Sequence, residues 1–239
     1  MLTLDKLKQL AVKNQTTVLN TQREYIQHLF LSYFYRQTAS SQIFFKGGTA
    51  LRLLYNSPRF SQDLDFSSQY KDIKRVEDAV IATLSEIERE GIQTEIIESK
   101  KTTGGYLATI EFKLSSQEVS IQIEISNRER DLKADIVTVV SDFIPSYTVL
   151  SLKLQSLVNE KLDALLTRKK PRDFYDLYFM LRARLISPSQ REVLEVSLIQ
   201  LKKTTINFEN ELKQFLPKTH WAIIRNFKQT LEKEIEKFI

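Results

Sequence analysis

Two groups of residues in this sequence have types and a spacing suited to joint chemistry. Gly47 and Gly48 follow the short apolar run Ile43–Phe45 and precede a segment of good helix formers. A glycine turn between a strand and a helix lets phosphate oxygens approach the backbone closely, and the start of the helix offers unpaired N–H groups. This arrangement predicts a binding site for a polyphosphate.

The second group is an acidic pair. Asp63 and Asp65 flank Leu64 in a segment whose composition predicts a strand. Residues spaced by two on a strand point to the same side, so both carboxylates can reach one divalent cation. Acidic pairs at this spacing are common by chance, and a lone glycine pair before a helix is more often an ordinary turn than a phosphate site. Their succession within 20 residues, strand, glycine turn, helix and acidic strand, is much more restrictive and favours a site for a metal and a nucleotide.

The elements that must position these residues follow from the spacing of apolar side chains. Spacings of three and four predict two helices in an N-terminal segment, residues 1–37, and a further helix over residues 73–90. Alternating apolar residues over 106–114 and 119–125 predict antiparallel strands. The glycine turn therefore lies between helical and sheet-forming segments.

The rest of the chain is helical in pattern, from about Val149 to Ile239. A length of 239 residues favours one domain with a sizeable appendage. We therefore expect an α+β fold over residues 1–145, with a small mixed or antiparallel sheet, followed by an α-helical domain over residues 146–239.

Composition excludes several kinds of site. The chain has no cysteine, which removes thiolate catalysis and thiolate metal sites, and its two histidines, His28 and His220, are too few for a histidine-built zinc site. The net charge of +5 indicates a mild preference for polyanionic partners. No apolar run is long enough to span a membrane and no signal peptide begins the chain, so we expect a cytoplasmic protein without a membrane partner.

Two motifs carry a family resemblance. The segment Lys46–Phe66, KGGTALRLLYNSPRFSQDLDF, resembles the motif of nucleotidyltransferase toxins of the AbiEii/AbiGii (MenT-like) group, within the polymerase-β-like nucleotidyltransferase superfamily. Glu160–Leu177 resembles that family's C-terminal lysine and Arg-Asp-x-x-Asp-Leu signature. One departure is Gly48-Thr49, where many polymerase-β-like relatives have Gly-Ser. Thr49 keeps the hydroxyl, so we expect its role to persist.

The resemblance implies a toxin of a type IV-like toxin–antitoxin or phage-defence (abortive infection) system. Its implied activity is Mg²⁺-dependent transfer of a nucleotide from an NTP to an RNA acceptor, the 3′ end of tRNA, with release of pyrophosphate. The implied partner is an antitoxin encoded by a neighbouring gene, and we expect a monomer. Protein nucleotidyl transfer and a non-catalytic module that binds GTP or RNA are the alternatives.

The resemblance also implies roles for individual residues of the first motif. Gly47, Gly48 and Thr49, preceded by Lys46, become the phosphate-binding turn, and Asp63 and Asp65 become the metal ligands. The third metal ligand is Glu124 or Glu111, each of which lies between two apolar strand residues. We favour Glu124, because the related fold takes its last acidic ligand from a strand after the hairpin.

In the second motif, Lys161 becomes a cation that contacts the nucleotide and Asp176 a functional acid. The sequence supports a special position for Lys161, which falls inside the apolar stripe of its helix between Val158 and Leu165. A buried lysine needs a partner, and a short connection around Pro171 would fold the next helix alongside. We expect a Lys161–Asp176 ion pair facing the active-site cleft; a purely structural salt bridge is the alternative.

Three further features lie next to these motifs. Arg59 is a candidate for bidentate binding of a triphosphate, and Ser61 is a candidate for orienting the aspartates or for regulation by phosphorylation. The run from Arg168 to Arg172 holds four cations. It favours contact with an RNA backbone, although a solvated helix end has the same composition.

Overall fold

The computed structural model describes residues 1–70, 72–114, 117–127 and 132–239, which divide into two compact units. The sheet unit consists of Met1–Asn56 and Phe60–Leu152, and the helical unit consists of Ser57–Arg59 and Lys153–Ile239. The predicted boundary at residue 145 lies just before a strand of the sheet, and the division falls after Leu152.

The sheet unit is a mixed α/β structure. Its helices are α1 (Leu4–Lys13), α2 (Val18–Phe34), the 3₁₀ helix η1 (Thr38–Gln42), α3 (Gly47–Tyr55) and α4 (Ile73–Arg89). Its strands are β1 (Ile43–Lys46), β2 (Leu64–Ser68), β3 (Gln93–Thr102), β4 (Gly105–Leu114), β5 (Gln117–Ser126), β6 (Ala134–Val139) and β7 (Tyr147–Leu152). The described strands form one seven-stranded sheet in the order β3-β4-β5-β2-β1-β7-β6. The β2–β5 and β1–β7 pairs are parallel and the other neighbours are antiparallel, so the sheet is mixed and larger than the small sheet predicted.

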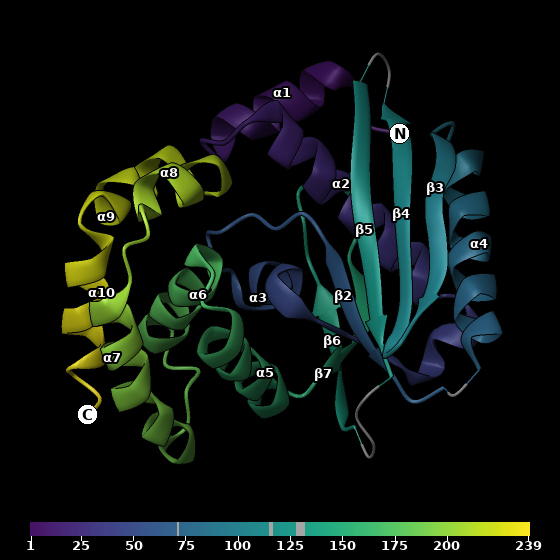
Figure 1. The fold of residues 1–239 in the computed structure, drawn as a ribbon. Coiled ribbons are helices and arrows are strands. Elements are labelled where there is room, and N and C mark those ends of the chain that lie inside the picture. The colour runs from purple at the N-terminus through teal and green to yellow at the C-terminus, as the bar shows by residue number, and fades with distance from the viewer. Residues whose placement is uncertain (71, 115–116, 128–131) are drawn as a thin grey trace. The chain divides into compact units, whose positions relative to one another are not determined.

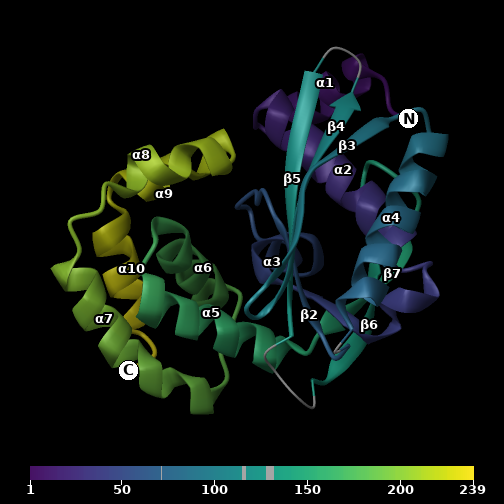
Figure 2. The ribbon, with the colours of Figure 1, turned by 45° about the vertical axis from the view of Figure 1, so that its right-hand side comes forward.

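Helices cover both faces of this sheet. Within the sheet unit, α2 and α4 lie on one face and α3 on the other (Figures 1 and 2). The side chains of β2 alternate accordingly: Leu64 and Phe66 are fully buried, and the Phe66 ring lies 5.2 Å from that of Phe34 on α2. Asp65 therefore points to the opposite face, where α3 begins.

The segment before the helical unit differs from the sequence prediction, which was wrong there. Helical spacing was predicted from about Val149, but Tyr147–Leu152 forms β7, which pairs with β1 and β6. Val149 and Leu152 are three residues apart, which fits a helix, although the short run Tyr147–Leu152 is also suited to a strand. The pairing with β1 decides between the two readings, and it is not a local property of the sequence.

The helical unit contains α5 (Leu154–Arg168), α6 (Pro171–Arg182), α7 (Leu194–Lys203), α8 (Phe208–Leu212), α9 (Trp221–Arg225), α10 (Phe227–Ile235) and the 3₁₀ helices η2 (Pro188–Val193), η3 (Lys213–Phe215) and η4 (Lys218–His220). Helices α5 and α6 pack against each other after a turn in which Lys169 has a φ of +51°. Pro171 is the first residue of α6, where its missing N–H costs nothing. The rings of Phe174, Phe208 and Phe227 join α6, α8 and α10 in an aromatic core.

Candidate active site

The glycine turn packs directly against one of the predicted metal ligands. Gly47 begins α3 with a φ of +81°, a conformation that side chains with a Cβ rarely adopt. A Cβ at this position would lie 2.0 Å from Oδ2 of Asp65, so the space beside the carboxylate admits only glycine. Both the backbone conformation and the close approach of Asp65 therefore require glycine here.

Two hydrogen bonds hold the segment that leads into Asp63. Thr49 is fully buried in the first turn of α3, and its hydroxyl donates to the backbone carbonyl of Asp63. From α2, the side-chain amide of Gln27 donates to the carbonyl of Ser61 over 3.0 Å. The Thr49 hydroxyl, which we expected to bind phosphate, thus connects the glycine turn to the acidic segment. Ser61 is held through its backbone carbonyl.

Three charged residues form a row across neighbouring strands. Lys46 on β1 pairs with Asp65 on β2, and Asp65 pairs with Glu124 on β5. Directly paired residues share a face of the sheet, so the three side chains lie on the same side. Glu111 instead pairs with Ser120, on β4 and beyond β5, away from Asp65. The register therefore favours Glu124 over Glu111 as the third carboxylate.

The carboxylates near the glycine turn suit a hard divalent cation, because Asp63, Asp65 and Glu124 offer only oxygen donors. Their side chains do not yet converge. Among the residues that the structure describes, no group of three or more His, Cys, Asp or Glu side chains is placed to hold a metal ion. The strand register places Asp65 beside Glu124, and Asp63 precedes this strand.

The helical unit holds a buried ionic cluster. Nζ of Lys161 donates to Oδ2 of Asp176 over 2.8 Å, which is the expected ion pair between α5 and α6. Arg59 adds a bidentate contact, with 2.8 Å from Nε to Oδ1 and 3.0 Å from a terminal nitrogen to Oδ2. The three residues are 8%, 1% and 4% exposed in the order Lys161, Asp176 and Arg59. Arg59, predicted to bind triphosphate, thus directs two of its donors to Asp176.

This cluster fixes the charge of its carboxylate. Burial by itself would raise the pKa of Asp176, but the adjacent Arg59 and Lys161 charges and hydrogen bonds lower it to about 2. Burial lowers the pKa of the Arg59 guanidinium and Asp176 raises it, and the increase prevails. Two cations surround one anion, so the cluster carries an excess positive charge.

The cationic run forms the connection between α5 and α6. Arg168 makes a bidentate contact with the buried Asp173, at 2.7 Å from a terminal nitrogen to Oδ1, and Asp173 also accepts from the backbone N–H of Lys170. Lys169 and Lys170 are exposed. The run is therefore partly a helix end that Asp173 organises, and partly a pair of lysine side chains open to solvent.

A polar patch on α2 was not predicted from the sequence. Glu24, 8% exposed, accepts from Nε of Arg52 on α3 over 2.8 Å, and the preceding Arg23 lies within electrostatic reach of Asp63. On the next turn, burial lowers the pKa of His28 to about 3 and keeps it neutral, and its Nδ1 lies 2.8 Å from the hydroxyl of Tyr147. The available signal was the run of polar residues on a helix that is buried on almost every side.

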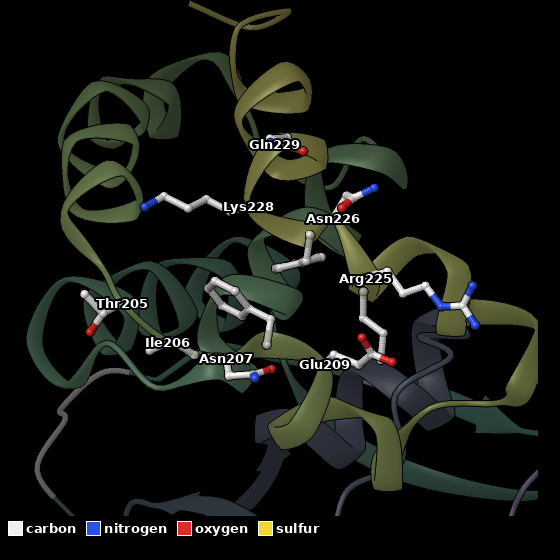
Figure 3. Close-up of a pocket in the computed structure, with 11 residues that line it drawn as sticks. Thr205, Ile206, Asn207, Glu209, Arg225, Asn226, Lys228 and Gln229 are labelled. Carbon is white, nitrogen blue, oxygen red and sulfur yellow. The ribbon is translucent and has the colours of Figure 1, made fainter.

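The helical unit also contains an open cavity of about 490 Å³. It is lined by residues of the segments 205–209 and 224–229, which include none of the predicted site residues. In Figure 3, Lys228 extends toward the segment that carries Thr205, and its Nζ donates to the carbonyls of Lys202 and Thr204 over 2.8 and 3.0 Å. The lysine therefore joins α10 to the end of α7, and the cavity is a feature of this packing.

Comparisons with known proteins agree with the interpretation of the motifs. A family model described as nucleotidyl transferase AbiEii toxin, type IV toxin–antitoxin system, matches residues 29–237. The nucleotidyltransferase toxin MenT4 from Mycobacterium tuberculosis H37Rv has a similar fold, with a TM-score of 0.66 at 16% identity over 100% of this chain and 93% of MenT4. JHP933 from Helicobacter pylori gives a TM-score of 0.61 at 20% identity, over 93% of this chain and 95% of that one. No curated protein matches the chain.

None of the helices formed by the described residues is both long and apolar enough to cross a bilayer.

Proposed function

Because this chain belongs to the AbiEii family of toxins and is a nucleotidyltransferase, we propose that it transfers a nucleoside monophosphate from an NTP to RNA, at the 3′ end of tRNA. Pyrophosphate is the second product, because the bond that breaks joins the α- and β-phosphates. The family implies an NTP substrate and an antitoxin partner. Our proposal adds two points to what the family implies: an RNA acceptor and a role in abortive infection.

One observation carries the assignment of the site. The glycine turn at Gly47 lies against Asp65, and the row Lys46, Asp65 and Glu124 crosses three strands on one face. A site for phosphate and a source of carboxylates are thereby adjacent. Nucleotidyl transfer needs both, because the triphosphate must be held while its α-phosphate is attacked.

The residues present suit Mg²⁺, which Asp63, Asp65 and Glu124 would hold. When bound, Mg²⁺ would supply charge stabilisation at the α-phosphate and activation of the attacking hydroxyl. The N–H groups of Gly47 and Gly48 at the start of α3 would bind the outer phosphates, with Lys46 as an added cation. Thr49 acts through the backbone of Asp63, as a positioning residue.

The second motif supplies a cation for nucleotide binding. We assign Lys161 to nucleotide binding on the strength of the family signature. Oδ2 of Asp176 accepts from Nζ of Lys161 over 2.8 Å and so holds the lysine ammonium group at a fixed position. Because the cluster keeps an excess positive charge, Asp176 can orient Lys161 without neutralising it.

The test is incubation of purified protein and Mg²⁺ with total tRNA and each α-³²P-labelled NTP in turn. The wild type should label tRNA with one or more of the nucleotides. Asp65→Asn and Glu124→Gln should each reduce the rate by about 100-fold or more, since each removes charge that stabilises the transition state. Glu111→Gln is the matched control, because it removes the same group from a neighbouring strand, and it should retain activity.

Each other outcome contradicts a stated part of the proposal. Label that resists ribonuclease but not protease would make the protein a protein nucleotidyltransferase. Binding of GTP or RNA without label would indicate a non-catalytic module. Loss of activity in Glu111→Gln with activity retained in Glu124→Gln would show that the carboxylate assignment is wrong.

A further inference from the structure

Arg23 on α2 is a charged residue that the motifs do not include. Its side chain is half-buried, and its Nε is buried without a hydrogen-bond acceptor in the described part of the chain. Its charged neighbour is Asp63, one of the two aspartates of the first motif. Burial lowers the pKa of Arg23 and the carboxylate of Asp63 raises it, with the effect of burial larger.

An unpaired guanidinium N–H in this position is energetically unfavourable. A buried donor that loses its water partners without gaining an acceptor costs free energy, and the cost is larger for a charged group. Native proteins therefore pair almost all buried donors, and exceptions have a specific cause. For a guanidinium beside a catalytic carboxylate, an anionic ligand is such a cause.

Contacts of neighbouring residues hold the turn of α2 that carries Arg23. The next residue, Glu24, uses Arg52 of α3 as its partner over 2.8 Å, so Glu24 is occupied by another cation. The Arg52 guanidinium in turn lies 3.5 Å from the centroid of the Phe60 ring. One turn further along α2, Gln27 donates to the carbonyl of Ser61. This turn of α2 is thus fastened to both α3 and the acidic segment, with Arg23 on the same part of the helix.

We propose that Arg23 binds the triphosphate of the NTP beside Asp63 and is a nucleotide-binding residue of the site, an inference that rests on the proposed function. A triphosphate held by the carboxylates through a cation must lie next to them. An arginine fixed on a buried helix suits a small ligand in a defined position. Contacts to an RNA backbone are better served by exposed cations such as Lys169 and Lys170.

The test compares Arg23→Gln with Arg89→Gln, which removes the same charge from α4 at a side chain that is 72% exposed. Inorganic triphosphate with Mg²⁺ is the binding probe, read as the increase in melting temperature. Arg23→Gln should melt at the same or a higher temperature without ligand, because it removes a half-buried guanidinium whose Nε has no acceptor. Its increase with triphosphate should be much smaller than that of the wild type and of Arg89→Gln.

Kinetics provide the second measurement. In Arg23→Gln the KM for the labelled NTP should rise by about 10- to 100-fold, the range of a charge-assisted hydrogen bond, while kcat changes less. Arg23→Lys should recover part of the affinity. A purely structural arginine would instead lower the melting temperature of the ligand-free protein and leave KM unchanged.

The two proposals can fail separately. Transfer by the wild type with an unchanged KM in Arg23→Gln would overturn the role of Arg23 and leave the proposed function standing. Triphosphate binding that depends on Arg23, without transfer to any acceptor, would overturn the proposed function and leave the phosphate site. Absence of both binding and transfer would overturn both.

Discussion

Asp176 is the charge that makes a buried cluster of two cations possible. It is 1% exposed and accepts from both Arg59 and Lys161. Removing one partner of a buried ionic group leaves the others uncompensated, which costs more than the loss of an exposed ion pair. The stability of the helical unit and the position of Lys161 therefore depend on the same carboxylate.

This dependence has a pH signature. The pKa of Asp176 falls from 3.8 to about 2 on folding, so its contribution to stability is fully present above about pH 4 and is lost as pH falls toward about 2. The shift corresponds to roughly 2 kcal/mol. Asp176→Asn should therefore be less stable than the wild type at pH 7, and the difference in the free energy of unfolding should shrink below about pH 4, as measured by urea unfolding.

The control is Asp142→Asn, which removes an exposed carboxylate paired with Lys13. It should change stability little at any pH. If the difference between wild type and Asp176→Asn stayed constant from about pH 6 to about pH 3, the low pKa of Asp176 would be contradicted.

At the scale of elements, the sequence predicts those helices and strands that local patterns of residues determine. The succession β1, α3 and β2 followed from a glycine turn and an acidic strand, and the β4–β5 hairpin from strict alternation. The Lys161–Asp176 pair followed from a lysine inside an apolar stripe. Each of these signals lies within a short stretch of the sequence.

Features that depend on pairing over long distances were not predictable in this way. Strand β5 lies between β4 and β2, and its parallel pairing with β2 sets Glu124 beside Asp65. The Arg59–Asp176 contact joins residues 117 apart. Neither is encoded in a local pattern, because the loop closures that create them depend on the whole fold. The same limit explains why the spacing of apolar residues predicts a helix where β7 forms.

The start of α3 gives a test at this scale, because the chain offers a matched pair of glycines. Gly47 and Gly91 have φ values of +81° and +84°, but a Cβ at Gly47 would collide with Asp65 while one at Gly91 meets nothing within 4 Å. Gly91→Ala should therefore cost only the backbone strain, about 1 kcal/mol in the free energy of unfolding, and keep full activity. Gly47→Ala should cost more and lose activity, because Asp65 must move.

Unfolding in denaturant and the labelling assay measure the two effects. Equal losses of stability in the two variants, with activity kept in both, would contradict the requirement for close approach between Gly47 and Asp65.

At the scale of the whole molecule, charge bears on the acceptor. The chain carries a net charge of +5, and part of its basic character lies at the turn between α5 and α6. Arg168 is engaged by Asp173, whereas Lys169 and Lys170 are exposed. Exposed lysines next to a predicted functional motif favour contact with phosphates of a nucleic acid, which release counterions on binding.

This arrangement predicts a specific dependence on salt. If RNA is the acceptor, the logarithm of kcat/KM for tRNA should fall linearly with the logarithm of salt concentration between about 50 and about 200 mM. Replacing both Lys169 and Lys170 by glutamine should weaken tRNA use and reduce the slope by about 1 to 2, because each phosphate that a lysine neutralises adds about 0.7 to 0.9 to it. The KM for the NTP should be unaffected, because these lysines are assigned to the acceptor alone. A slope equal to that of the wild type would place the RNA-binding surface elsewhere, and a rate independent of salt would contradict an RNA acceptor.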